Sequence, residues 1–414
     1  MFSSKVINSL KIDEERLWSD LMTLGQIGFS QEKGVSRPAL SDKDLEARDW
    51  LKKKMETDGF DVRMDAAMNV IGTLQSPAKK SGKILVIGSH LDTVSSGGMF
   101  DGALGVVAGL ECARVLKEND VQLPWDLEII NFSDEEAAYN AGTVGSRAMI
   151  GKLTENEIFI SKTGDKETFA GQLKKAGMNP ERIGDAVRNP DTFAAILELH
   201  IEQGNRLETD GVQIGVVTGI VGIYRYIITV AGEADHAGTT PMDLRNDALV
   251  KAAPAFLQLP QWVQERNTEM VGTIGQITLK PGATNVVPGE CSFIVELRSM
   301  QNDDMEAVRD IIRIWVESHT GCSMKTILEK GSVALSDRLI HTISRAAEIE
   351  NLSNVTMHSG AGHDTQSFAP YVPCGMIFIP CRKGKSHNPE EWIDAQQAAE
   401  GCQVLLRTVL ELAK

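Results

Sequence analysis

The sequence has no long apolar run and no excess of positive charge, and each absence excludes a class of protein. Its 414 residues include 42 Lys and Arg against 57 Asp and Glu, which gives a formal net charge of -15 at pH 7. Phosphate binding needs clustered positive charge, so nucleic acid and anionic membrane surfaces are disfavoured as partners. No apolar stretch reaches the roughly 18 residues of a membrane-spanning helix. The sequence therefore predicts neither a nucleic-acid-binding protein nor a membrane protein.

Paired cysteine motifs are also missing. The six cysteines are scattered, several of them in apolar stretches, and none forms a CxxC motif. This distribution is typical of reduced, buried thiols rather than of disulfides or a zinc knuckle. The first residues lack the long apolar segment of a signal peptide. Together these features predict a cytoplasmic protein.

Apolar and charged residues, at 42% and 24%, occur in ordinary proportions for a globular chain of two or three domains. Short apolar stretches alternate with segments of helical periodicity, which predicts an α/β fold with a mixed, largely parallel sheet and helices on both faces. The expected strands are 83–88, 126–132, 194–200 and 375–380, and the expected helices are 13–27, 41–59, 103–118, 336–350 and 395–412.

The middle of the chain follows a different pattern. The expected strands there are 220–231, 271–279, 290–298 and 324–329, and the expected helices are 244–257 and 304–318. The order β-α-β-β-α-β is typical of a ferredoxin-like α+β unit. The sequence therefore predicts one domain made of residues 1–215 and 331–414, with a second domain, residues 216–330, inserted into it.

Residues that suit a metal ion follow the first expected strand. His90 and Asp92 lie at the end of that strand, and Asp101 precedes the next helix. Open α/β sheets place their chemistry at such strand ends, and imidazole and carboxylate groups are ligands for a metal such as zinc. Asp92 is placed to accept the other ring N–H of His90. Taken alone, the segment fits a metal-free His–Asp pair better than a metal site.

Similar residues follow the other three strands. The acidic segment 134–136 fits either a solvated turn or a site that combines a metal ligand with a general base. His200 closes the third strand, and His387 follows the fourth. The chain has only eight histidines, and three of them lie just beyond apolar strands of one domain. Their convergence with Asp101 and Glu136 favours a metal site.

These motifs resemble the M20-type metallopeptidase-related amidohydrolases, in the branch of N-carbamoyl-L-amino-acid hydrolases, allantoate amidohydrolases and ureidoglycolate amidohydrolases. The resemblance covers nearly the whole chain. It is carried by GSHLDT at 88–93, GGMFDG at 97–102, DEE at 134–136, ELHIEQG at 198–204, HAGTTPM at 236–242, NVVP at 285–288, SGAGHD at 359–364 and SHNP at 386–389. The peptidase branch usually has an acidic residue where this chain has His200. Ala137 and Ala138 depart from the pattern, because relatives commonly have Gly there.

The resemblance implies a site for two divalent metal ions, for which zinc, manganese, cobalt and nickel are all suitable. His90 and His200 would hold one ion, Glu136 and His387 the other, and Asp101 would bridge them. Glu135 would act as the general base toward a water that bridges the ions and attacks the substrate. Asp92 would orient His90.

The resemblance also implies roles for residues outside this cluster. His236 would stabilise the oxyanion of the tetrahedral intermediate in the partner subunit of a homodimer, so that the inserted domain serves as a dimerisation and lid domain. His236 as a simple turn residue and Arg298 as a surface charge remain open alternatives. The implied substrate-binding residues are Gln203, Asn285, Arg298, Gly360, Ala361 and Gly362.

The implied activity is hydrolysis of the ureido C–N bond of a small carboxylate-bearing compound. N-carbamoyl-L-amino acids, which would give amino acid, CO2 and ammonia, are the leading substrate class, and allantoate or ureidoglycolate is the alternative. A peptidase of the same fold is disfavoured by His200. A non-catalytic scaffold is disfavoured because Glu135, His236 and all five implied ligands are present. The motifs do not choose among the ureido substrates or the metals.

Overall fold

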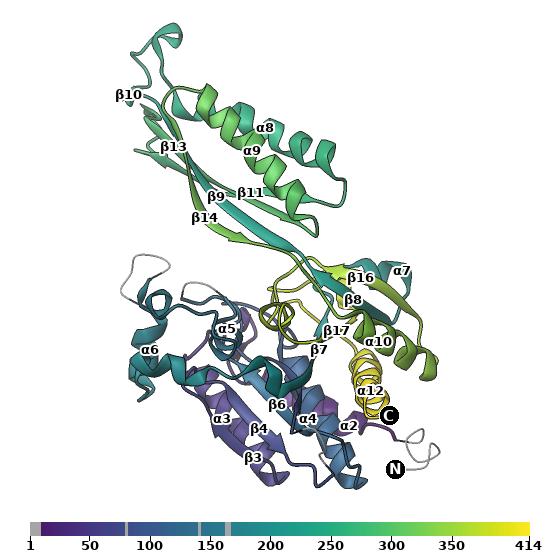
Figure 1. Cartoon of the computed structure of the whole chain (residues 1–414). Helices are drawn as coiled ribbons and strands as arrows, with labels where there is room; N and C mark the ends of the chain where they lie inside the picture. The colour runs from purple at the N-terminus through teal and green to yellow at the C-terminus, as the bar shows by residue number, and fades with distance from the viewer. Residues whose placement is uncertain (1–9, 79–81, 140–141, 162–166) are drawn as a thin grey trace. The chain divides into compact units, whose positions relative to one another are not determined.

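The computed structural model describes residues 10–78, 82–139, 142–161 and 167–414. The chain forms two compact units, one of Met1–Thr218 with Ala334–Lys414 and the other of Gly219–Val333 (Figure 1). Among the described residues, no helix has both the length and the apolar character needed to cross a membrane.

A nine-stranded sheet forms the centre of the first unit. Its strands are β3 (Asp61–Met64), β4 (Val70–Leu74), β5 (Ile84–His90), β6 (Asp126–Phe132), β7 (Phe193–Ile201), β8 (Ile214–Ile220), β15 (Val333–Ala334), β16 (Asn354–Ser359) and β17 (Cys374–Ile379). They lie in the order β15-β8-β17-β7-β5-β6-β4-β3, and β16 pairs with β8. The four central strands, β17, β7, β5 and β6, are parallel, and antiparallel strands flank them. The predicted α/β class with a mostly parallel central sheet is confirmed.

Helices cover both faces of this sheet. The helices of the unit are α2 (Glu14–Gly25), α3 (Asp42–Thr57), α4 (Ala103–Glu118), α5 (Val144–Met149), α6 (Phe169–Lys175), α7 (Arg206–Asp210), α10 (Asp337–Ile349), α11 (Thr365–Phe368) and α12 (Ala395–Leu412). The central helices α4 and α12 bury apolar side chains with those of β5 and β7 in one core. On the other face, Phe368 of α11 packs against Phe132 and Phe193.

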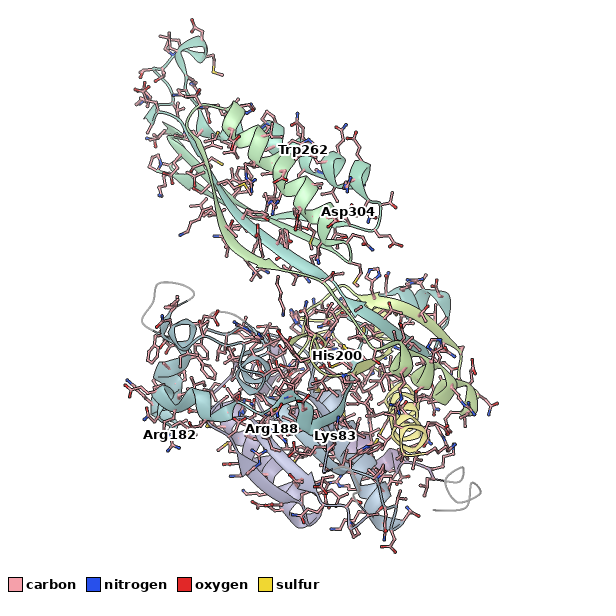
Figure 2. All side chains as sticks on the ribbon, viewed as in Figure 1. Lys83, Arg182, Arg188, His200, Trp262 and Asp304 are labelled. Carbon is pink, nitrogen blue, oxygen red and sulfur yellow. The ribbon has the colours of Figure 1, made fainter. Side chains whose placement is uncertain are left out.

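The second unit has a four-stranded antiparallel sheet in the order β11-β13-β9-β14. Its elements are β9 (Gly222–Ala231), β10 (Asp235–His236), α8 (Ala248–Arg266), β11 (Val271–Lys280), β12 (Val286–Val287), β13 (Glu290–Ser299), α9 (Asn302–Ser318) and β14 (Cys322–Lys330). Both helices lie on one face of the sheet and share its core (Figure 1). The labelled Trp262 and Asp304 belong to this helical layer (Figure 2), where Asp304 pairs with Arg266. The element order is the one that the sequence predicts.

One predicted helix has different bounds. The expected helix 244–257 is found as Ala248–Arg266, because the Asp247 side chain accepts hydrogen bonds from the backbone N–H groups of Leu249 and Val250 and so starts the helix later. The helix then continues through Pro254 and Pro260 instead of ending between them. Helix α3 begins after its N-cap Ser41, whose side chain accepts from the backbone N–H of Asp44 at 3.3 Å.

Candidate metal centre and active site

The predicted ligands of the first unit meet at one edge of the sheet. His90 ends β5, His200 lies near the end of β7, and Asp101 directly precedes Gly102, the N-cap residue of α4. Because β5, β6, β7 and β17 are parallel, the loops that follow them lie at the same edge of the sheet. Open α/β sheets bind ligands at this edge. Figure 2 labels His200 within this unit.

Asp101 is the centre of the cluster. Its Oδ1 lies 3.5 Å from Nε2 of His90 and 3.3 Å from Nε2 of His200. Its Oδ2 lies 3.7 Å from Nε2 of His387, and that nitrogen lies 3.1 Å from Oε2 of Glu136. The two oxygens of one carboxylate therefore face two different sets of ligand atoms, as a bridging ligand must.

Two groups of three ligand atoms, each within 4.8 Å of one another, share Asp101: one with His90 and His200, the other with Glu136 and His387. Imidazole nitrogens and carboxylate oxygens are the usual donors to zinc and similar divalent ions. The donor set therefore fits a pair of divalent cations.

Backbone carbonyls set the ring orientation of both buried histidines. Nδ1 of His90 lies 3.0 Å from the carbonyl oxygen of Asp92, and Nδ1 of His200 lies 2.9 Å from that of Ile201. A proton on each Nδ1 leaves a lone pair on each Nε2 on the side of Asp101, which is the tautomer that a metal ligand needs. Nε2 of His200 also accepts the backbone N–H of Gly102 at 3.2 Å.

The Asp92 side chain has a different contact from the one predicted. Its carboxylate is 3.8 Å from the His90 ring, because the backbone carbonyl of Asp92 already occupies that side of the imidazole. The carboxylate instead accepts backbone N–H bonds from Glu135 (3.4 Å) and Glu136 (3.1 Å). Asp92 therefore holds the acidic loop directly and orients His90 through its main chain.

The charged groups of the cluster shift the pKa values of one another. Burial opposes ionisation of Asp101, yet His200 and His90 hold the pKa of this carboxyl well below its usual range. Burial lowers the pKa of His200, but the Asp101 charge outweighs it and raises this pKa to about 9. The hydrogen bond to Glu136 raises the pKa of His387 to about 9. The carboxylates therefore attract positive charge, which a divalent ion held by the ring nitrogens would supply.

Glu135 lies beside the predicted ligands. Its Oε2 is 3.8 Å from Nε2 of His90. Burial raises the pKa of the Glu135 carboxyl well above its usual range, and the charges of Glu136 and Asp364 raise it further. A carboxyl with a raised pKa next to a metal group has the properties of a general base and acid.

Gln203 contacts the metal cluster rather than standing apart from it. Its Nε2 donates to Oδ2 of Asp101 at 2.7 Å, while its buried Oε1 has no hydrogen-bond partner in the described structure. The backbone of Gln203 has a φ of +59°, a left-handed conformation that is uncommon for a residue with a side chain. The residue therefore offers one unsatisfied acceptor at the edge of the site.

The predicted loop of Gly360, Ala361 and Gly362 follows β16. The Ser359 hydroxyl braces it by accepting from the N–H of Ala361 at 3.1 Å and by lying 2.8 Å from Nε2 of His363. The Ala361 N–H is thus used within the loop. A Cβ at Gly360 would meet nothing within 4 Å, and one at Gly362 would make only an ordinary contact. The protein itself leaves space beside both glycines.

The second unit brings together two of its three predicted residues. His236 pairs with Val286 in the short sheet of β10 and β12, and the Asn285 carbonyl accepts from the N–H of Ala237. Nδ1 of His236 accepts backbone N–H bonds from Gly238 (3.0 Å) and Thr239 (3.2 Å). In the neutral ring the proton therefore lies on Nε2, which makes this exposed nitrogen a hydrogen-bond donor.

Arg298 lies apart from that pair, near the other end of β13. Its Nε donates to Glu296 at 2.8 Å, and the same carboxylate accepts from Nε of Arg225 on β9 at 2.7 Å. Glu296 thus fixes the plane of the Arg298 guanidinium.

Sequence reasoning missed two residues of the cluster. Ser386 donates through its hydroxyl to Oδ2 of Asp101, and Glu391 accepts backbone N–H bonds from the Asp101 loop. Both flank His387 in the segment SHNPEEW at 386–392. The two adjacent carboxylates of this segment, Glu390 and Glu391, were the available sequence signal. Glu391 lies four residues from the predicted ligand His387, and its hydrogen bonds to the Asp101 loop account for its burial.

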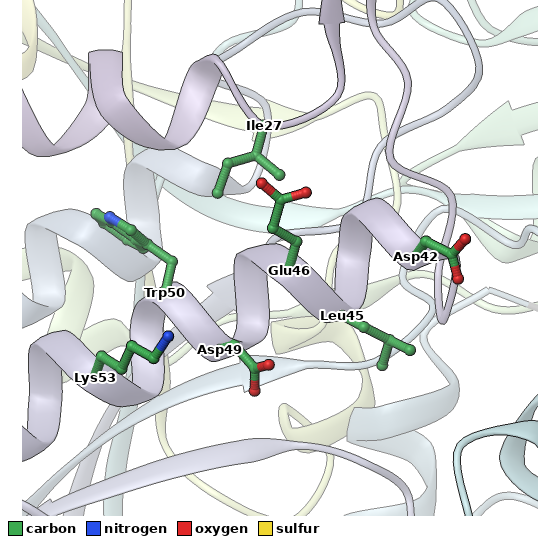
Figure 3. Close-up of a pocket in the computed structure, with 7 residues that line it drawn as sticks. All are labelled: Ile27, Asp42, Leu45, Glu46, Asp49, Trp50 and Lys53. Carbon is green, nitrogen blue, oxygen red and sulfur yellow. The ribbon is translucent and has the colours of Figure 1, made fainter.

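One surface hollow lies away from these residues. It runs along α3 beside Trp50 and is bordered by three carboxylates, Asp42, Glu46 and Asp49 (Figure 3). None of the predicted site residues lines it, so this hollow contributes nothing to the candidate site.

Comparisons with known proteins agree with the geometry. The profile of the family described as Peptidase family M20/M25/M40 matches residues 86–411. The chain belongs to this family. It is 36% identical to an N-carbamoyl-L-amino acid amidohydrolase of Geobacillus stearothermophilus over 97% of this chain and 99% of the relative. It is 34% identical to a ureidoglycolate hydrolase of Oryza sativa subsp. japonica over 97% of this chain and 85% of the relative.

A solved structure agrees as well. The crystal structure of an amidase of the hydantoinase/carbamoylase family from Burkholderia multivorans superposes with a TM-score of 0.84 at 31% identity, covering 98% of this chain and 99% of that one. The predicted family and the hydrolase class are therefore confirmed. Amidohydrolases of this family are metal dependent, and the described residues include candidate metal-binding groups.

Proposed function

We propose that the protein is a two-metal amidohydrolase that cleaves the ureido C–N bond of N-carbamoyl-L-amino acids. The single observation that carries the proposal is the bridging arrangement of Asp101 between two sets of ligand atoms, with Glu135 at its side. His90 and His200 would hold one ion, Glu136 and His387 the other. Bound there, the ions would lower the pKa of a coordinated water to near neutrality.

Glu135 has the position and the raised pKa for both proton transfers. It would take a proton from the attacking water and deliver it to the nitrogen that leaves the ureido carbon. One water is consumed, and the products are the amino acid, CO2 and ammonia. The exposed Nε2–H of His236 would donate to the oxygen that becomes negative in the transition state.

The spacing within the second unit supports a site shared between two subunits. His236 lies beside the Glu290 end of β13, because Gly289 and Ala234 are in contact there, whereas Arg298 lies eight residues along the same strand. At about 3.3 Å per residue, this separates the two ends by about 26 Å. A carbamoyl amino acid is much shorter, so His236 and Arg298 of one chain cannot both touch it. A homodimer in which His236 and Asn285 reach the partner's site resolves this conflict, and the second unit would then act as its dimerisation and lid domain.

Two residues would recognise the substrate through polar contacts. Arg298, with its plane fixed by Glu296, would clamp the substrate carboxylate through two parallel hydrogen bonds. The unpartnered Oε1 of Gln203 would accept an N–H of the ureido group. The open space beside Gly360 and Gly362 would let the substrate approach the backbone.

Allantoate or ureidoglycolate is the alternative substrate. The similarity to a ureidoglycolate hydrolase at 34% identity supports it, since both substrates combine a ureido group with a carboxylate. The residues described above serve either class equally.

The test is an assay of released ammonia with N-carbamoyl amino acids, allantoate, ureidoglycolate and a dipeptide panel. We expect turnover of N-carbamoyl-L-amino acids that is lost on chelation and restored by Mn²⁺, Zn²⁺, Co²⁺ or Ni²⁺. Preference for allantoate or ureidoglycolate would select the alternative. Full turnover by metal-free protein, or cleavage of dipeptides alone, would contradict the proposal.

A further inference from the structure

Glu391 is a buried carboxylate that the proposed chemistry does not use. It lies in the loop between His387 and α12 and is only 3% exposed. Its neighbour Glu390, by contrast, is exposed and pairs with Lys385 at the surface. Burial of an ionisable side chain is costly unless its oxygens are fully hydrogen-bonded, so the contacts of Glu391 indicate what it does.

Those contacts are made with the loop that carries the bridging ligand. Oε1 of Glu391 accepts the backbone N–H of Phe100 at 2.9 Å and that of Asp101 at 3.0 Å. One carboxylate oxygen thus holds two consecutive peptide groups and fixes the main chain at the residue whose two oxygens face both sets of ligands.

The other oxygen of Glu391 reaches the side chain of the same aspartate through a serine. Oε2 lies 3.3 Å from the Ser386 hydroxyl, which is hydrogen-bonded to Oδ2 of Asp101. Asp101 is therefore held at its backbone by Glu391 directly and at its carboxylate through Ser386.

The surroundings are built to admit this carboxylate. A Cβ on Gly98 would overlap the carboxyl carbon of Glu391, so only glycine leaves room for it. On the other side, the Trp392 ring packs edge-on against Phe100 at 5.4 Å between centroids and against Trp18 at 6.0 Å. A backbone turn, from the N–H of Glu391 to the carbonyl of Asn388, fixes the loop in between.

We propose that Glu391 is a positioning residue of the metal centre, which locks the loop of the bridging Asp101 to the loop of His387 and so sets the distance between the two sets of ligands. Glu391 would act through the Asp101 main chain and the Ser386 hydroxyl, which are its observed contacts. The inference rests on the proposed metal centre, but it concerns ligand geometry and holds for any substrate that the enzyme accepts.

The test compares Glu391→Ala with Glu391→Gln and uses Glu390→Ala as the matched control. The readout is the affinity of metal-stripped protein for Mn²⁺ and Zn²⁺, measured by calorimetric titration with elemental analysis of the number bound. Loss of a partner that orients metal ligands costs about 10- to 100-fold in metal affinity, which is the effect expected for Glu391→Ala. Glu390→Ala should match the wild type.

Glu391→Gln should recover most of the affinity, and this recovery separates positioning from charge. The amide oxygen can still accept both backbone N–H groups, and the amide nitrogen can donate to the Ser386 hydroxyl, which keeps its own proton for Asp101. Gly98→Ala, which displaces the carboxylate without removing it, should reproduce the loss, and it replaces Glu391→Ala if that variant does not fold.

Three results would overturn the inference: wild-type metal affinity in folded Glu391→Ala, wild-type affinity in Gly98→Ala, or equal losses in Glu390→Ala and Glu391→Ala. Wild-type protein that binds no divalent ion would overturn both this inference and the proposed function. Wild-type protein that binds metal but hydrolyses no ureido compound would overturn the proposed substrate alone and leave the role of Glu391 standing.

Discussion

The two units of the chain hold their candidate residues in opposite ways. In the first unit, His90, His200 and Asp101 are almost fully buried, and each contacts another member of the cluster. In the second unit, His236 is exposed, and Arg298 lies near the other end of a ten-residue strand. Groups that must hold an ion in fixed geometry need a rigid surround, whereas groups that meet a substrate must remain accessible. On the proposed function, the buried residues of the first unit would hold the metal ions and activate the water, and the accessible residues of the second unit would meet the substrate.

The largest expected effect tests the role of the first unit by replacing the proposed general base, Glu135. Glu135→Gln preserves shape but removes the proton acceptor, so we expect kcat to fall by at least about 100-fold with metal content unchanged. Glu136→Gln, the adjacent control, should instead lower metal occupancy because Glu136 contacts His387. Steady-state kinetics with elemental analysis measures both. Near-normal turnover of Glu135→Gln would show that the two roles are misassigned.

A recognition residue should have a different signature. Arg298→Lys keeps the charge but loses the planar fork, which should cost about 2–3 kcal/mol of transition-state binding, given about 1.5–3 kcal/mol for a charged hydrogen bond. This corresponds to a fall of about 30- to 150-fold in kcat/KM. Discrimination between a carbamoyl amino acid and its carboxamide should fall with it. Arg225→Lys, which alters the other partner of Glu296, is the control. Wild-type enzyme that hydrolyses acid and amide equally well has no carboxylate clamp.

Mixing His236→Ala chains with Glu135→Gln chains tests whether His236 and Glu135 of one chain act in the same active site. His236→Ala and Glu135→Gln chains should each be nearly inactive. After random reassembly of dimers, about a quarter of wild-type activity should return, because half of the dimers are mixed and each of these has one intact site. Size-exclusion chromatography with differently tagged chains verifies the mixed dimers. If mixed dimers form and no activity returns, His236 acts within its own chain or outside catalysis.

The sequence predicted the buried central strands and the ligands at their ends better than the exposed parts of the chain. The four central strands are short apolar runs with candidate ligands at or just past their ends, so β5, β6, β7 and β17 were found within two residues, as was α4, the helix that follows Asp101. The edge strand β3 was missed because it has only four residues, three of which are exposed. Candidate metal ligands can be recognised from residue type, because imidazole and carboxylate groups are the usual donors to divalent ions.

Residues that act by positioning a ligand are harder to predict from the sequence than the ligands themselves. Glu391 and Ser386 reach Asp101 across nearly 300 positions of sequence, and no local periodicity encodes such a contact. Likewise, the orientation of His90 by the main chain of Asp92 rather than by its carboxylate depends on backbone direction. That direction follows from the folded loop and not from residue identity.

The smallest predicted effect concerns strain in the acidic loop of the first unit. Ala137 has a φ of +55°, the left-handed conformation, which costs a residue with a Cβ about 1–2 kcal/mol and glycine almost nothing. Glycine also gains entropy in the unfolded chain, which offsets about 0.4–1 kcal/mol. Ala137→Gly should therefore raise the free energy of unfolding by about 0 to 1.6 kcal/mol, seen as a small rise in Tm at unchanged kcat.

Ala138→Gly is the matched control for this strain, because Ala138 is adjacent and exposed and its φ is not positive. Here glycine adds only flexibility to the unfolded chain, so Tm should fall slightly. A difference of opposite sign between the two variants would show that the loop behind Glu135 and Glu136 is held in a strained conformation by its surroundings, including the Asp92 carboxylate. Equal decreases in both would mean that Ala137 adopts this conformation at no cost.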